Sequence, residues 1–90
     1  MREKFKLIEG IFSAKDAREI LLTLIEEKIK FHELKSFSDE VKTGAKNNQS
    51  LLKIEELKNT RVNILSFLVK DEHKNESFHL TSSIEIEKVI

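Results

Sequence analysis

The stretch FKLIEGIFSAKDAREI, residues 5–20, decides the fold, because it changes from the pattern of a strand to that of a helix. Its first half alternates apolar side chains at a period of two. Phe5, Leu7 and Ile11 fall on one face, and Ile8 and Phe12 fall on the other. A lone strand has nothing to pair with, so the chain must supply a second strand farther along.

A helix start follows this strand directly. The Ser13 hydroxyl can accept a hydrogen bond from amides of the first turn, and Asp16 suits the positive end of the helix dipole. We therefore expect a strand over residues 4–12 and Ser13 as the N-cap of a helix over residues 14–35. Gly10 indicates either a bulge in the strand or a close approach of the backbone.

The first helix is too apolar to lie against one neighbour. At about 100° per residue its apolar side chains cover roughly 240°, and a helix on a single surface needs far less. These side chains are Ala17, Ile20, Leu21, Leu22, Leu24, Ile25, Ile29, Phe31 and Leu34. We expect this helix to pack against two neighbours at once, such as a sheet and another helix, or a second subunit.

A polar connection over residues 36–48 should separate the first helix from a second one over residues 49–72. A short helical turn can begin at Ser38 and end at Gly44. The cap of the second helix should be Asn47, Asn48 or Ser50. Its apolar face covers about 160°, formed by Leu51, Ile54, Leu57, Val62, Ile64, Leu65, Leu68 and Val69.

The last segment supplies the missing strand, over residues 77–89. It places apolar side chains on one face and polar ones on the other, and the apolar ones are Phe78, Leu80, Ile84, Ile86 and Ile90. Because two antiparallel helices return the chain to its starting end, the two strands should pair antiparallel. We expect a single α+β domain of order β-α-α-β, with a long antiparallel helical hairpin packed on a small antiparallel sheet.

Size and composition predict association with a second copy. Ninety residues form one domain with a thin core, and a two-stranded sheet is marginal by itself. A homodimer would complete the fold, either by joining the sheets edge to edge or by forming a four-helix layer. The chain has no Cys, no signal-peptide pattern and no segment of membrane length, so we expect a cytoplasmic protein without a membrane partner.

Two residues of the first helix, Lys28 and His32, could offer cationic donors to an anionic ligand or partner. His32 falls in the centre of the apolar arc, and Lys28 lies near the same line. The structural alternative is a helix end that leaves the core, with side chains that snorkel to water. We favour this alternative, because a lone His among apolar neighbours is usually structural.

Two residues of the second helix, Lys58 and Arg61, lie within its apolar arc. They could recognise an anion. In a hairpin that turns near residue 43, however, Arg61 lies across from Glu26 or Glu27, and charges near a core are usually paired. We favour the interhelical ion pair.

Metal and catalytic sites are not predicted. The segment DEHKNESFH holds carboxylates and imidazoles without a recognised ligand spacing, so we interpret it as a solvated turn; its candidate ligands are Asp71, Glu72, His73, Glu76 and His79. No set of nucleophile, base and acid can be singled out. We expect no enzyme activity and no cofactor.

Residues 6–38, KLIEGIFSAKDAREILLTLIEEKIKFHELKSFS, resemble the N-terminal half of small, uncharacterised bacterial proteins. The shared features are a strand, then EG-x-F-S-x-x-DA, then a helix that ends in KI-x-FHEL. The resemblance implies no activity and no site residue.

The sequence therefore favours a non-enzymatic homodimer that docks a protein partner. The alternative is a small regulator that contacts nucleic acid through the basic region 42–61, where residues 28–61 carry 8 basic and 5 acidic side chains. The net charge of +0 and the lack of a helix-turn-helix spacing weigh against it. A ligand-binding pocket around His32 and Lys28 is a third hypothesis.

Overall fold

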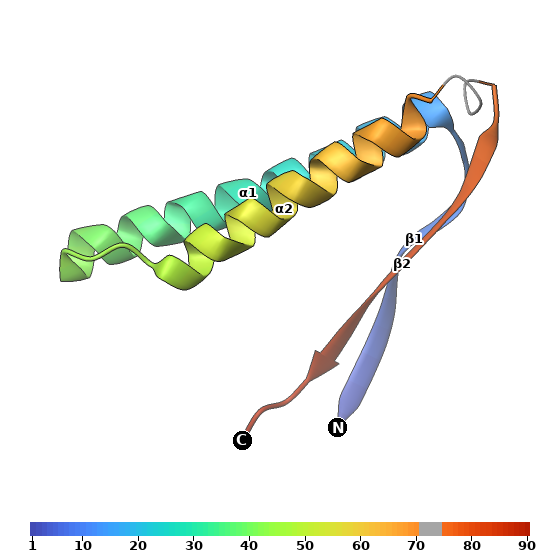
Figure 1. Cartoon of the computed structure of the whole chain (residues 1–90). Helices are drawn as coiled ribbons and strands as arrows, with labels where there is room; N and C mark the ends of the chain where they lie inside the picture. The colour runs from blue at the N-terminus through green and yellow to red at the C-terminus, as the bar shows by residue number, and fades with distance from the viewer. Residues whose placement is uncertain (71–74) are drawn as a thin grey trace.

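The computed structural model describes residues 1–70 and 75–90, which form four elements in the order β-α-α-β. Strand β1 spans Arg2–Ser13, helix α1 Ala14–Thr43, helix α2 Asn48–Leu68 and strand β2 Ser77–Glu87. The helices form a long hairpin, and the strands pair antiparallel as a two-stranded ribbon (Figure 1). The α+β class and the helical hairpin expected from the sequence are confirmed.

Helix α1 is longer than expected, because it continues to Thr43 and not to residue 35. Residues 36–43 are mostly polar, but they contain neither Gly nor Pro, so nothing in them breaks the helix. Gly44 ends it in the left-handed conformation at φ 76°, and its amide donates to the Glu40 carbonyl at 2.8 Å. The connection expected over residues 36–48 is thus only residues 44–47.

Helix α2 begins one residue earlier than expected, and Asn47 is its cap. The Asn47 side-chain oxygen accepts from the Ser50 amide at 3.0 Å, and its amide nitrogen donates to Asp39 at 2.6 Å. The bond to Asp39 ties the start of α2 to the last turns of α1. The helix ends at Leu68 and not at residue 72; residues 71 and 72 lie outside the described part of the chain.

The strand register contains a bulge at Leu7, between the pairs Lys6–Ser83 and Ile8–Ser82. The extra residue reverses the alternation of β1, so Phe5 lies opposite Ile84 and shares the face of Ile8. The expected grouping of Phe5 with Leu7 and Ile11 is therefore wrong.

The bulge does not occur at Gly10, one of the two roles expected for that residue. A Cβ there would lie 3.2 Å from the side-chain ring of Phe12, so a larger residue at position 10 would require that ring to move. The strands also end differently from the predicted ranges 4–12 and 77–89. Paired strand extends to Arg2 and stops at Glu87, where the two side chains form an ion pair at 2.9 Å.

The ribbon contacts the helices only near their junction and then diverges from them (Figure 1). Phe12, Phe78 and Leu80, near the junction, are half-buried. On the same face near the free end, Phe5 is 54% exposed and Ile86 is 57% exposed. The packing of the hairpin on the sheet is thus limited to one end of the ribbon, because the long strands outreach the place where the helices cover them.

The hydrophobic core lies between the two helices and is small. Ile25, Ile29 and Ile54 are buried together, with Leu57 and Ile64 packed against them. Among the described residues no large side chain is fully buried. This interhelical cluster holds the hairpin together, but little of it extends beneath the ribbon.

The molecule exposes more surface than a compact monomer of its size. The chain has an accessible surface of 7373 Å², whereas a compact monomer of 10.5 kDa exposes about 5,400 Å². Its radius of gyration is 16.4 Å, and a compact chain of this length has about 12 Å. The excess of about 2,000 Å² per chain results from the open angle between the helical hairpin and the ribbon.

We expect Ser13→Ala to destabilise the protein by about 1 kcal/mol. The Ser13 hydroxyl accepts from the Asp16 amide at 3.1 Å and is the cap of α1. Ser13→Thr keeps a hydroxyl and should lose only a few tenths of a kcal/mol. Urea unfolding followed by circular dichroism measures both variants, and equal losses would show that the cap contributes nothing.

Candidate functional site

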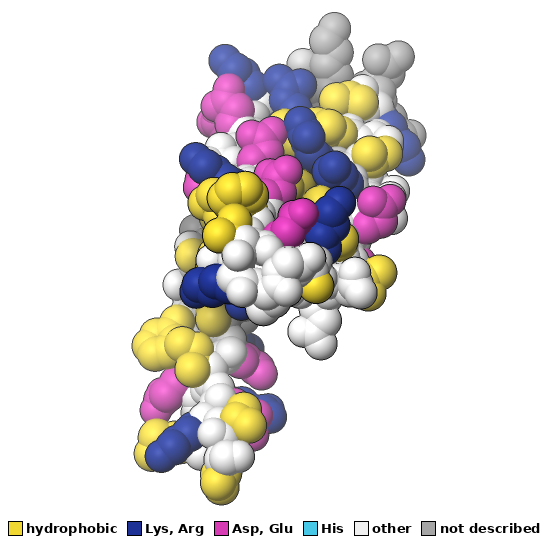
Figure 2. Space-filling model, turned by 90° about the vertical axis from the view of Figure 1, so that its left-hand side faces the viewer, with side chains coloured by type: hydrophobic (Ala, Val, Ile, Leu, Met, Phe, Trp, Pro, Cys, Tyr) yellow, Lys and Arg dark blue, Asp and Glu magenta, His cyan; other side chains and the backbone are white. Residues whose placement is uncertain are grey.

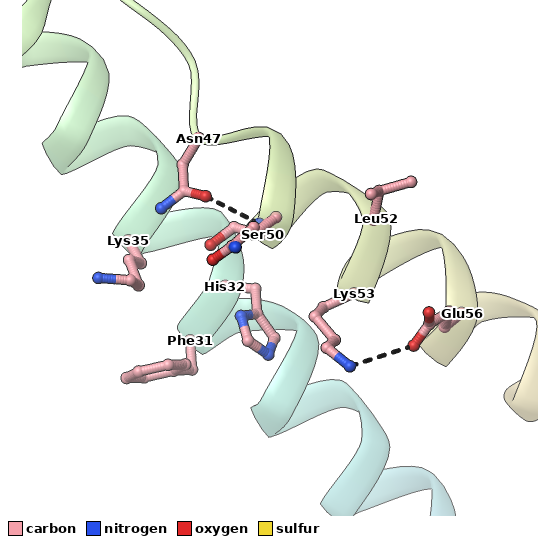
Figure 3. A pocket seen from close by; sticks show the side chains of 9 residues that line it. Phe31, His32, Lys35, Asn47, Ser50, Leu52, Lys53 and Glu56 are labelled. Carbon is pink, nitrogen blue, oxygen red and sulfur yellow. Dashed lines mark hydrogen bonds and ion pairs between the residues drawn. The ribbon is translucent and has the colours of Figure 1, made fainter. Parts of the chain in front are cut away.

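A pocket of about 540 Å³ lies on the helical hairpin near its turn (Figure 3). Among the four residues singled out from the sequence, only His32 lines it; Lys28, Lys58 and Arg61 lie outside. Its other walls include Phe31, Lys35, Ser50, Leu52 and Lys53. The four candidate residues therefore do not form one site.

His32 points between the two helices in Figure 3, and its ring nitrogens are buried. Neither nitrogen has a hydrogen-bond partner in the described structure. The ring instead contacts Phe31 edge to face, with centroids 5.3 Å apart. A buried polar group without a partner lowers stability, because it has given up its hydrogen bonds to water.

We expect His32→Leu to stabilise the protein by about 1 kcal/mol, since it replaces an unsatisfied imidazole with an apolar side chain of similar size. His32→Gln is the matched control, because it keeps a polar group at the same place and should not stabilise. Thermal unfolding at pH 7 measures both. A loss of stability in His32→Leu would show that the imidazole makes a favourable interaction.

The basic middle of the chain is partly neutralised by its own carboxylates. Arg61 and Glu26 form an ion pair across the hairpin at 3.1 Å, the structural interpretation given above. Lys53 pairs with Glu56 at 3.5 Å one turn along α2. Paired cations have less charge to offer to phosphates, so these contacts do not favour the nucleic-acid alternative. Lys28 and Lys58 are exposed on their helices.

His79 bonds to a carboxylate across the ribbon. Its Nε2 lies 2.7 Å from the Glu9 carboxylate, and the described residues contain no group of three or more side chains able to hold a metal ion. Asp71, Glu72 and His73 lie outside the described residues.

The hydrogen bond from His79 lowers the pKa of Glu9 below its ordinary value of 4.5, against an opposing effect of burial, and Lys6 lowers it further. A carboxylate with a lowered pKa in the folded state stabilises the protein above its unfolded pKa. That contribution is lost as the pH falls through the folded pKa.

We therefore expect Glu9→Gln to lower the melting temperature slightly at pH 7, and we expect the difference to shrink as the pH falls and Glu9 becomes protonated. Lys15→Gln, at an exposed position of α1, controls for the loss of a charge. Melting curves from pH 7 to pH 3 measure the difference. A difference that grows toward low pH would contradict the assignment.

A second cavity, of about 530 Å³, lies where the hairpin and the ribbon diverge. Its walls are largely apolar and come from both helices and β2 but not from β1; they include Leu21, Ile64, Phe67, Leu68, Phe78 and Leu80. We call it the junction cavity. The sequence did not predict it, because Phe67 falls outside the expected apolar arc of α2 and only the meeting of α2 with β2 encloses the space.

Two further apolar surfaces are uncovered. One is the outer stripe of α1, residues Phe31, Leu34, Phe37 and Val41, which are 59%, 61%, 65% and 69% exposed. The other is the free end of the ribbon, residues Phe5, Ile84 and Ile86. In Figure 2 this end projects below the helices, with hydrophobic side chains visible among charged ones.

Comparisons with protein-family models, with curated proteins and with solved structures find no match for this chain. None of the helices within residues 1–70 and 75–90 combines the length and the apolar character needed to cross a membrane. The described residues leave apolar surface at three places: the junction cavity, the outer stripe of α1 and the free end of the ribbon.

Proposed function

We propose that this protein is a non-enzymatic homodimer that works as a protein–protein interaction module. The observation that carries the proposal is the excess of about 2,000 Å² of accessible surface per chain. A stable interface needs about 800 Å² from each partner. A dimer that buries most of the excess falls in the size range of obligate homodimers.

The outer stripe of α1 is the surface for a different protein. Its apolar side chains lie within about 120° of the helix circumference, on the side opposite Ile25 and Ile29. Spacings of three and seven residues between Phe31, Leu34 and Val41 suit an apolar helix laid alongside. The stripe lies on the hairpin near its turn, far from the ribbon, so one face can bind a partner while the other dimerises.

Sedimentation equilibrium tests the dimer. The chain has a mass of 10.5 kDa, so a dimer sediments at about 21 kDa, and we expect that mass throughout the low micromolar range. A single species at the monomer mass up to 100 micromolar would overturn the proposal.

A comparison of variants tests the partner surface. Leu34→Gln and Phe37→Gln alter the outer stripe, and Val62→Gln, 60% exposed on α2, is the matched control. A protein retained from native lysate by the wild type and Val62→Gln, but lost from both stripe variants, is a partner of the stripe. Equal retention by all four would overturn this part of the proposal.

A further inference from the structure

The two edges of the ribbon differ in how well they resist pairing with another strand. An unpaired edge is a template for a further strand unless a bulge, a Pro or a Lys blunts it. Strand β1 has the bulge at Leu7 and carries Arg2, Lys4 and Lys6. Strand β2 has no extra residue in its register and holds no Lys, Arg or Pro; its carboxylates, Glu85 and Glu87, both form ion pairs with Arg2 of β1. No further strand of the described residues pairs with this edge.

We propose that a second copy of this chain pairs antiparallel with the free edge of β2, with the two-fold axis at Ser82, to give a four-stranded sheet in the order β1-β2-β2′-β1′. The inference rests on the proposed homodimer and names the surface that forms it.

The register follows from the pattern of β2. A shift by one residue would place every apolar side chain opposite a polar one, so only registers that keep the faces aligned are allowed. With the axis at Ser82, Ile84 lies opposite the partner subunit's Leu80, and Ile86 lies opposite the partner subunit's Phe78. This register also pairs all eleven residues of the strand, without an overhang.

The polar face is complementary in the same register. Glu85 lies opposite the partner subunit's His79, and Thr81 lies opposite the partner subunit's Ser83. Hydroxyl pairs are favourable across strands, and like charges facing each other are not. No like-charged pair occurs along the new edge.

The junction cavity supplies a place for the partner's apolar side chains. It is lined by Phe78 and Leu80 of β2 and by the helices, and by no residue of β1. It therefore lies on the side of the ribbon where β2 has its free edge. The partner's Ile84 and Ile86 stand directly opposite Leu80 and Phe78 on the same face, so they enter this cavity.

The same arrangement covers the free ends of both ribbons. A two-fold axis perpendicular to the sheet keeps both hairpins on one face and sets the two ribbons head to tail. The free end of each ribbon then lies beside the helix junction of the other. Ile84 and Ile86, which are 44% and 57% exposed in one chain, become interior residues of the dimer.

Disulfide trapping tests the axis. The protein has no Cys, so Ser82→Cys introduces a single thiol. Its Cβ lies about 4.5–5.5 Å from its symmetry mate across the strands, close to the span of a disulfide. Ser77→Cys is the matched control, because its mate is about 33 Å away. Lys4→Cys reports pairing through the edge of β1.

We expect Ser82→Cys to form a covalent dimer under mild oxidation, at least about ten-fold faster than Ser77→Cys, which is beyond disulfide reach. If sedimentation shows a dimer but Ser82→Cys reacts no faster than Ser77→Cys, the edge pairing is wrong and the homodimer stands. If Lys4→Cys forms the covalent dimer faster than Ser82→Cys, the interface lies at the edge of β1 and the proposed pairing through β2 is wrong. A monomer would overturn both proposals.

Amide exchange of the unmodified protein gives an independent measurement. In an isolated ribbon, every second amide of β2 faces water and exchanges quickly. Pairing with a second copy protects both the amides that face β1 and those that face the other edge of β2. Slow exchange of consecutive amides along residues 79–85 supports the proposal, and alternating fast exchange at a concentration where the protein is dimeric contradicts it.

Discussion

Ile54→Ala is expected to remove a large fraction of the protein's free energy of unfolding at 25 °C. Ile54 is 8% exposed and joins Ile25 and Ile29 in the interhelical core. Truncating a buried Ile destabilises by about 2–5 kcal/mol, and a chain of this length has a stability of only about 5–13 kcal/mol. Because the core is small, few neighbours can move in to fill the space.

The matched control is Leu52→Ala, two residues earlier on α2, where the side chain is 65% exposed. We expect a loss below about 0.5 kcal/mol there. Urea titrations at one fixed protein concentration, followed by helical circular dichroism, compare the variants, because association would make stability depend on concentration. Equal losses at the two positions would show that the interhelical cluster is not the main core.

Ile84→Glu is expected to dissociate the proposed homodimer with little effect on the fold of one chain. Ile84 is 44% exposed on the free part of the ribbon, so a single chain can turn a carboxylate there toward water. In the proposed dimer the same position faces the partner subunit's Leu80. Burying a charge beside it should weaken association by at least about 2 kcal/mol, or roughly 30-fold in the dissociation constant.

Ile11→Glu is the control for the same chemical change. Ile11 is 76% exposed and lies opposite His79, on the polar face of the ribbon. We expect that variant to remain a dimer. Sedimentation over a range of concentrations compares the two, with circular dichroism to check folding. Unchanged association of Ile84→Glu would contradict burial of this face.

The candidate sites show what a sequence pattern can and cannot locate. The antiparallel hairpin placed Arg61 opposite Glu26 or Glu27, and the structure selects Glu26 at 3.1 Å. Patterns along each helix did not show that Lys28 and His32 separate, with only His32 in the pocket near the turn. Which side chains share a cavity depends on the rotation of one helix against the other, and a single helix does not fix that.

Local chemistry determined much of this fold by itself. Ser13 and Asn47 cap the helices, Gly44 ends α1, and two alternating segments form the strands, because each of these effects acts within a few residues of chain. Which side chains of β1 share a face could be determined only from the paired strands, because the bulge at Leu7 arises from the register with β2. The open angle between ribbon and hairpin was likewise decided by tertiary packing, because it depends on where two long strands leave a short junction with the helices. That angle leaves the apolar surface on which the proposed function rests.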